Sequence, residues 1–338
     1  MKTPFGGTRD PFYFYRLHSL AVGLALMAVA GGPVAAVHAQ GFPSKAMRMI
    51  VPFPPGGGGD ISSRILAESM TKGLGQPVIV ENRPGGGAVI GYELGARAPG
   101  DGHTLLVVFP SFVISAAIRR GLSYDPIRDF RAVGQTARAP MALAIHPSVP
   151  AKSLKELIAL ARARPGEISY GTAGAGTTQH FVGEMFRLAA NLSIVHVPYK
   201  GAGPAATALA GGHIPMVVSS LPAIAPLIKA GKVRPLVITT PERLEGFPNV
   251  PTLREAGYPG LEATIWIGLV APSATPSRVI SRLNAELLRT LGNREVQAKL
   301  KAQDLFPSPS TPEEFAALLR SESARYASVV RKAGIKVD

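Results

Sequence analysis

Two glycine-rich segments carry the residues most suited to binding chemistry. The first, Val51-Pro-Phe-Pro-Pro-Gly-Gly-Gly-Gly-Asp60, runs from apolar residues through four glycines into a helical pattern that begins at Ile61. Glycine leaves backbone N–H groups uncovered, and the first turn of a helix adds unpaired N–H groups and a partial positive charge. This combination binds anions. Taken alone, the segment fits a plain turn capped by Asp60 equally well.

The second glycine-rich segment repeats this arrangement and adds hydroxyl groups. Ile168-Ser-Tyr-Gly-Thr-Ala-Gly-Ala-Gly-Thr-Thr-Gln-His180 again leads from a strand pattern through glycines into a helix. Neither segment matches a nucleotide motif, because the Gly-Lys-Ser/Thr ending and the third glycine of the dinucleotide fingerprint are missing. Two such loops in different parts of the chain therefore predict one small carboxylate held between them.

The first 39 residues have the pattern of a secretory signal peptide. A basic start with Lys2, Arg9 and Arg16 precedes an apolar stretch over residues 20–37 and the small-residue ending Val37-His38-Ala39. We expect cleavage near Ala39 and release into the periplasm of a bacterial cell. An uncleaved membrane anchor is the alternative, since the apolar stretch could just span a bilayer.

Composition excludes several classes of protein. The chain has no cysteine, which rules out disulfides and thiol chemistry. The formal net charge is +14, but the basic residues are dispersed, and export from the cytoplasm argues against nucleic acid as a partner. A basic surface that attracts small anions is the better interpretation.

Short apolar runs alternate with helical patterns along the chain. Such alternation predicts an α/β fold with mostly parallel sheets, whose ligands bind at the carboxyl ends of the strands. Capping boxes begin helices at Ser153 and Thr311, and Thr275-Pro276 begins another. The predicted strands cover residues 49–53, 78–81, 104–109, 142–146, 168–171, 194–197, 216–219, 236–239 and 266–271.

The order of further motifs resembles one family over nearly the whole chain after the signal. These motifs include Glu81-Asn-Arg-Pro-Gly-Gly86, Asp101-Gly-His-Thr-Leu105, Tyr124-Asp-Pro-Ile-Arg-Asp-Phe130, Val197-Pro-Tyr-Lys-Gly201 and Trp266-Ile-Gly-Leu-Val-Ala-Pro272. Together with the two glycine loops, they resemble the Bug family of periplasmic solute-binding receptors for tripartite tricarboxylate transporters.

The resemblance implies a two-lobed, type II-like periplasmic-binding-protein fold in which each lobe is a mostly parallel sheet flanked by helices. We expect residues 1–39 to be the signal peptide. Lobe 1 is expected to combine residues 41–140 and 241–338, and lobe 2 to comprise residues 141–240. A small organic acid, a di- or tricarboxylate or an aromatic acid, would bind between the lobes. The expected partners of this monomer are the large and small subunits of a membrane transporter, or alternatively a signalling partner.

The resemblance also implies which residues hold the ligand, through backbone amides, hydroxyls and ordered water. The expected ligand-binding residues are Phe53, Pro55, Gly56, Gly57, Gly58, Asp60, Ser111, Phe112, Thr172, Ala173, Gly176, Thr177, Thr178, Tyr199 and Ser219. Within this set, we expect Asp60 mainly to cap its helix, because it would repel an anion. Phe112 fits a cleft wall or a core residue equally well.

The residues do not support catalysis, a metal or a cofactor. A serine hydrolase needs a Gly-x-Ser-x-Gly elbow, which the chain lacks, and no acidic pair stands out for acid–base chemistry. His180 and Glu184 are spaced as metal ligands on a helix, but the sequence offers no third ligand. Ser219 replaces an acidic residue of many relatives, so we expect a carboxylate without an amine.

Overall fold

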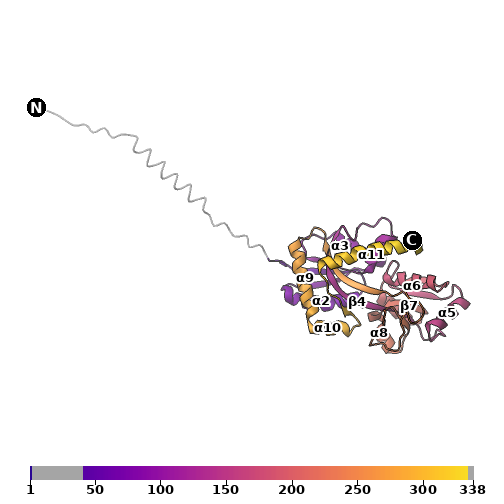
Figure 1. Cartoon of the computed structure of the whole chain (residues 1–338). Coiled ribbons are helices and arrows are strands. Elements are labelled where there is room, and N and C mark those ends of the chain that lie inside the picture. Colours follow the sequence, from indigo (N-terminus) through magenta and orange to yellow (C-terminus); the bar gives the residue numbers. More distant parts are fainter. Residues whose placement is uncertain (2–40, 334–338) are drawn as a thin grey trace. The chain divides into compact units, whose positions relative to one another are not determined.

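The structure, a computed structural model, describes Met1 and residues 41–333 (Figure 1). The predicted signal peptide and its cleavage at Ala39 lie outside the described residues. Phe42 begins a single compact unit, which is described here. Its strands are β1 (Met47–Val51), β2 (Val78–Asn82), β3 (Thr104–Val108), β4 (Phe130–Ile145), β5 (Ser169–Thr172), β6 (Val195–Pro198), β7 (Met216–Ser220), β8 (Arg234–Ile238), β9 (Thr264–Pro272) and β10 (Phe306–Pro307).

The helices lie mostly between successive strands, as the alternating pattern predicts. They are α2 (Gly58–Leu74), α3 (Val89–Ala96), α4 (Pro110–Ile118), α5 (Leu154–Ala163), α6 (Thr178–Ala189), α7 (Ala202–Ala210), α8 (Leu221–Lys229), α9 (Ser277–Gly292), α10 (Arg294–Lys301) and α11 (Pro312–Ala333), with a short 3₁₀ helix, η1, at Gly86–Ala88. The capping box at Thr311 is confirmed, because Thr311 and Glu314 each accept the other's backbone N–H. Among the described helices, none is long and apolar enough to cross a membrane.

The strands pair in the order β2-β1-β3-β9-β4-β7-β5-β6, and β8 and β10 also pair with β4. β1 lies parallel to β2 and β3, and β5 lies parallel to β6 and β7. The long strands β4 and β9 run antiparallel to their neighbours. The strands on both sides of the sheet are therefore parallel, as expected, whereas the central strands β4 and β9 are antiparallel to their neighbours, which was not expected.

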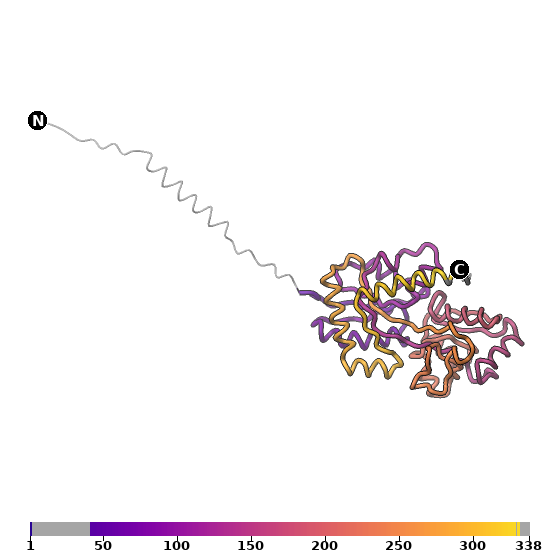
Figure 2. The backbone as a smooth tube through the Cα atoms, in the orientation of Figure 1, coloured from indigo at the N-terminus to yellow at the C-terminus, as the bar shows by residue number. Residues whose placement is uncertain are grey.

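Strand β4 connects two groups of strands. Its first part, Phe130–Pro140, pairs with β9, and its second part, Met141–Ile145, pairs with β7. We call β1, β2, β3, β9 and β10 the first group, and β5, β6, β7 and β8 the second. Helices α2, α3, α9, α10 and α11 lie with the first group and α5, α6 and α8 with the second (Figure 1). Figure 2 shows that early segments and the C-terminal helices share one half, although they are distant in sequence.

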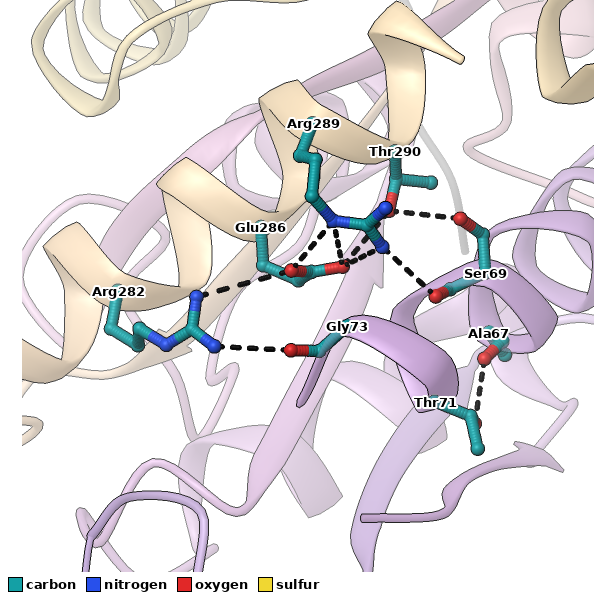
Figure 3. A network of polar contacts seen from close by, with 8 residues as sticks. All are labelled: Ala67, Ser69, Thr71, Gly73, Arg282, Glu286, Arg289 and Thr290. Carbon is teal, nitrogen blue, oxygen red and sulfur yellow. Dashed lines mark hydrogen bonds and ion pairs between the residues drawn. The ribbon is translucent and has the colours of Figure 1, made fainter. Parts of the chain in front are cut away.

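A polar network joins helix α2 to helix α9 in the first group (Figure 3). Glu286, which is 2% exposed, accepts hydrogen bonds from Arg289 Nη2 at 2.6 Å and from Thr290 Oγ1 at 3.3 Å. Arg289 Nη2 also donates to Ser69 O at 3.2 Å, and Arg282 Nη2 donates to Gly73 O at 3.1 Å. A Cβ at Gly73 would overlap the Glu286 carboxylate, so a side chain there would have to displace this ion pair. These contacts fix the C-terminal half of α2 on α9.

Candidate ligand-binding site

Five helices begin around one cavity between the two groups of strands. Their N-cap residues are Gly57 of α2, Phe109 of α4, Thr177 of α6, Gly201 of α7 and Ser220 of α8. The cavity has a volume of about 490 Å³, including its open mouth. It is lined by Phe53, Pro54, Gly57, Gly58, Gly59, Phe109, Ser111, Ala139, Ala173, Thr178, Gln179, Ala202, Ser220, Ile265 and Ile267.

The polar groups that could attract an anion to the cavity are backbone N–H groups at helix ends and not charged side chains. In α2 the first intrahelical bond is Ile61 N to Gly57 O, and in α6 it is Phe181 N to Thr177 O, each 3.0 Å. Within the described residues, the N–H groups of Gly58, Gly59 and Gln179 have no acceptor. None of the lining residues carries a charged side chain. Several partial positive helix ends therefore face an uncharged cavity, which suits an anion.

The first glycine loop is fixed by Asp60 behind the cavity. The Asp60 carboxylate accepts hydrogen bonds from Gly56 N at 3.1 Å, Arg64 Nε at 3.0 Å and Asn82 Nδ2 at 2.9 Å. Burial opposes ionisation of Asp60, but the hydrogen bonds from Arg64, Asn82 and Gly56 together hold its pKa below the usual value. The expected capping role of Asp60 is wrong, because the N-cap of α2 is Gly57, which has no side-chain cap, and Asp60 lies in the first turn and holds the preceding Gly56 N–H. Among the expected loop residues, Pro55, Gly56 and Asp60 lie outside the cavity lining, whereas Phe53, Gly57 and Gly58 belong to it.

The second glycine loop is held by its own hydroxyls. Thr177 Oγ1 donates to Gly174 O at 2.7 Å and accepts from His180 N at 3.4 Å, as the N-cap of α6. Thr172 Oγ1 lies 2.7 Å from His196 Nε2. Of the residues expected from this loop, Ala173 and Thr178 line the cavity, and Thr172, Gly176 and Thr177 support the loop from outside the lining.

A histidine pair lies beside the second glycine loop, with His180 buried and His196 partly exposed. The rings of His180 and His196 stack with centroids 4.0 Å apart, and His180 Nδ1 accepts the N–H of Gly176 at 3.2 Å. Burial and, to a smaller extent, the neighbouring His180 lower the pKa of His196 to about 4. Burial also lowers the pKa of His180. The Glu184 carboxylate accepts hydrogen bonds from Tyr170 and Arg187, and the described residues contain no group of three or more candidate metal ligands.

We expect the histidine pair to make the protein less stable in acid. Since the pKa of His196 is about 4 in the folded state and about 6.5 when unfolded, the unfolded state binds more protons between these values. The free energy of unfolding should therefore fall as pH decreases from 6.5 to 4, by about 2 kcal/mol after allowance for partial exposure. Urea titrations of the wild type and His196→Gln should show a shallower decline in the variant. His213→Gln, at an exposed position, is the matched control, and an equal decline in all three proteins would contradict this assignment.

Three more residues of the expected ligand-binding set lie outside the cavity lining. Phe112 is fully buried, stacks on Tyr124 with ring centroids 5.4 Å apart, and does not line the cavity, so it is a core residue and not a cleft wall. Ser219 is 1% exposed and lies outside the lining, because the alternation along β7 directs Ser220 to the cavity instead. Tyr199 is half-buried against the second group of strands and also lies outside the lining.

Ser111 joins the cavity as expected, and the structure adds lining residues outside the expected ligand-binding set. Ser111 Oγ lies 2.7 Å from Tyr92 OH at the start of α4. The added polar residues are Gln179 and Ser220. The added apolar or small residues are Pro54, Gly59, Phe109, Ala139, Ala202, Ile265 and Ile267. Alternation within β9 could have indicated Ile265 and Ile267, because residues two apart face the same side of a strand.

Comparisons with known proteins agree with this architecture. Residues 62–335 match the model of the tripartite tricarboxylate transporter family receptor. Protein BugT of Bordetella pertussis is 35% identical over 316 residues, covering 93% of this chain and 97% of BugT. Among solved structures, Rhodopseudomonas palustris Rpa4515 with adipate is 34% identical, with a TM-score of 0.84 and coverage of 87% of this chain and 99% of that chain.

Two further solved structures extend the comparison. MatC from Rhodopseudomonas palustris with bound malate is 31% identical, with a TM-score of 0.82 and coverage of 86% of this chain and 100% of MatC. The periplasmic binding protein BugD is also 31% identical, with a TM-score of 0.84 and coverage of 87% of this chain and 99% of BugD. The chain has the periplasmic-binding-protein fold and belongs to the Bug-type receptor family of tripartite tricarboxylate transporters.

Proposed function

We propose that this chain captures a small organic carboxylate in the cavity between the two groups of strands and delivers it to a tripartite tricarboxylate-type transporter. One observation carries the proposal: five helix N-termini surround a cavity whose lining residues are all uncharged. Partial positive charges at these ends attract a carboxylate, and their unpaired N–H groups can donate hydrogen bonds to it.

The structures of relatives support an acid as the ligand. Rpa4515 was solved with adipate and MatC with malate, and both relatives share the fold at above 30% identity. Adipate and malate are both dicarboxylates of four to six carbons. The ligand-binding set that we propose for this chain combines Phe53, Gly57, Gly58, Ser111, Ala173 and Thr178 with the added lining residues, including Gln179 and Ser220.

The cavity favours an acid without an amine. An ammonium group in a desolvated cavity needs a strong acceptor, or it keeps a large desolvation penalty. The lining residues include no carboxylate, and Asp60 is occupied by Gly56, Arg64 and Asn82. The rings of Phe53 and Phe109 and the side chains of Ile265 and Ile267 form an apolar wall that fits an alkyl chain or an aromatic ring.

We infer that the lobes divide near residues 140 and 240 and that the cavity lies between them. The change of partners along β4, from β9 up to Pro140 to β7 from Met141, supports the first boundary. In this interpretation residues 41–140 and 241–338 form one lobe and residues 141–240 the other. The receptor acts as a monomer in the periplasm, after cleavage near Ala39, without catalysis or a cofactor. It passes its ligand to the large and small membrane subunits.

Calorimetry with matched acids tests the proposed function. We expect succinate to bind more tightly than aspartate, because the two differ by one ammonium group that the cavity cannot pair. Benzoate should likewise bind more tightly than glutamate, and adipate and malate complete the set. Tighter binding of the amino acids would contradict the substrate assignment, and no binding of any acid would contradict the receptor function.

A further inference from the structure

One peptide unit in the second glycine loop is held from two sides. The peptide between Ala175 and Gly176 accepts a hydrogen bond at its carbonyl from Arg119 Nη2 at 3.4 Å. Its N–H donates to His180 Nδ1 at 3.2 Å. Gly174 and Gly176 have φ values of 136° and 79°, in the region that favours glycine. Because a glycine follows this peptide, its orientation depends on these two partners in addition to the Thr172 and Thr177 hydroxyls that hold the rest of the loop.

The two partners of this peptide come from different groups of strands. His180 lies in α6, which follows β5 of the second group, whereas Arg119 is the C-cap residue of α4, which follows β3 of the first group. The N-terminal turn of α4 contributes Ser111 to the cavity. Helix α4 thus has Ser111 in the cavity wall at its start and Arg119, bonded to the Ala175 carbonyl, just after its end.

The two groups approach each other through glycines on both sides of the cavity. A Cβ at Gly87, in η1, would overlap the Ala175 carbonyl, and a Cβ at Gly201 would lie 2.5 Å from Pro54 Cγ. Such contacts leave no space for a side chain at either glycine. At Gly87, the close approach involves the same Ala175 carbonyl that Arg119 contacts.

The surroundings of Arg119 suit a contact that exists only while the groups are together. Arg119 Nε is buried without a hydrogen-bond partner in the described part of the chain, as is the nearby Ser115 Oγ. A guanidinium that is shielded in this way loses hydrogen bonds to water and gains a hydrogen bond to the Ala175 carbonyl. If the groups moved apart, Arg119 would regain water and the peptide would lose one of its two partners.

We propose that Arg119 is a positioning residue that sets the second glycine loop when the two groups of strands come together. The inference rests on the proposed function, because the loop continues into Thr178 and Gln179 at the cavity. The contact favours the arrangement in which both sets of helix ends face the ligand. When the population of that arrangement decreases, the apparent affinity for the ligand falls in proportion, and bound ligand dissociates faster.

Binding kinetics of two neighbouring arginine variants test this role. Arg119→Met should bind adipate and malate about tenfold more weakly, through a faster dissociation rate and an unchanged association rate. Arg119→Lys, which keeps a donor, should recover part of the loss. Arg120→Met is the matched control, because Arg120 is exposed, and it should stay within about twofold of the wild type.

A distance measurement separates this inference from the proposed function. Since the natural chain lacks cysteine, Lys155→Cys on α5 and Ser281→Cys on α9 give two unique spin-label sites. In the unliganded protein, Arg119→Met should shift the distance distribution to longer values, and Arg120→Met should not. Equal distributions and equal dissociation rates in the two variants would overturn the role of Arg119. Failure of the wild type to bind any acid would instead contradict the receptor function, and the distances would still decide the role of Arg119.

Discussion

Replacing Gly57 with valine is expected to abolish carboxylate binding while the protein stays folded. Gly57 is the N-cap of α2 and has an extended backbone, with φ of −87° and ψ of 162°, which any residue adopts. A Cβ there would meet no protein atom within 4 Å. Because Gly57, Gly58 and Gly59 all line the cavity, we expect the valine side chain to obstruct ligand access to the Gly58 and Gly59 N–H groups without displacing neighbours. We expect at least a hundredfold loss of affinity, which is about 2.7 kcal/mol.

Calorimetry with adipate and a thermal unfolding curve for the same variant check this prediction. Gly292→Val is the matched control, because a Cβ at Gly292 also meets no atom within 4 Å and the residue ends α9 away from the cavity lining. The control should bind as the wild type does. Full affinity in Gly57→Val would remove the first glycine loop from the site.

The second large effect is expected at Arg289, on the network of Figure 3. Arg289 pairs with the carboxylate of Glu286, which is 2% exposed. Arg289→Ala would leave this buried carboxylate without its main partner, and breaking a buried pair in this way is strongly destabilising. Because the Arg289 side chain is itself half-exposed, we expect a loss of about 2–4 kcal/mol. The melting temperature should fall by roughly 5–10 °C.

Arg282→Ala gives the comparison for this network. Arg282 lies 3.9 Å from Glu286 and donates to Gly73 O, so its removal leaves the Glu286–Arg289 pair intact. We expect a loss below about 1 kcal/mol, in line with exposed ion pairs. Chemical unfolding of both variants measures the difference. Equal stability of Arg289→Ala and the wild type would show that Glu286 does not depend on this arginine.

Local signals in the sequence are enough to predict most elements near the cavity. Both glycine loops and the capping box at Thr311 depend on neighbouring residues alone, and they appear where their patterns place them. Local patterns do not predict the first half of β4. Two register shifts, between Ala132 and Gly134 and between Gln135 and Ala137, disturb the alternation of side chains that marks a strand.

The lining of the cavity depends on tertiary packing, which local patterns do not contain. Ala139 reaches the cavity only because β4 pairs with β9, and Ile265 and Ile267 do so from β9 itself. Phe112 lies one residue from Ser111, yet the helical turn directs it to the aromatic core instead. The glycine turns into α2 and α6 were therefore predictable from the sequence, whereas most of the cavity wall was not.

A crystal structure with adipate tests the central claim most directly. We expect a ligand carboxylate with its oxygens about 2.7–3.2 Å from backbone N–H groups at the start of α2 or α6, and the alkyl chain against Ile265 and Ile267. We also expect that no lysine or arginine side chain contacts this carboxylate. A carboxylate held by such a side chain, or bound outside this cavity, would contradict the claim that helix N-termini recognise the ligand.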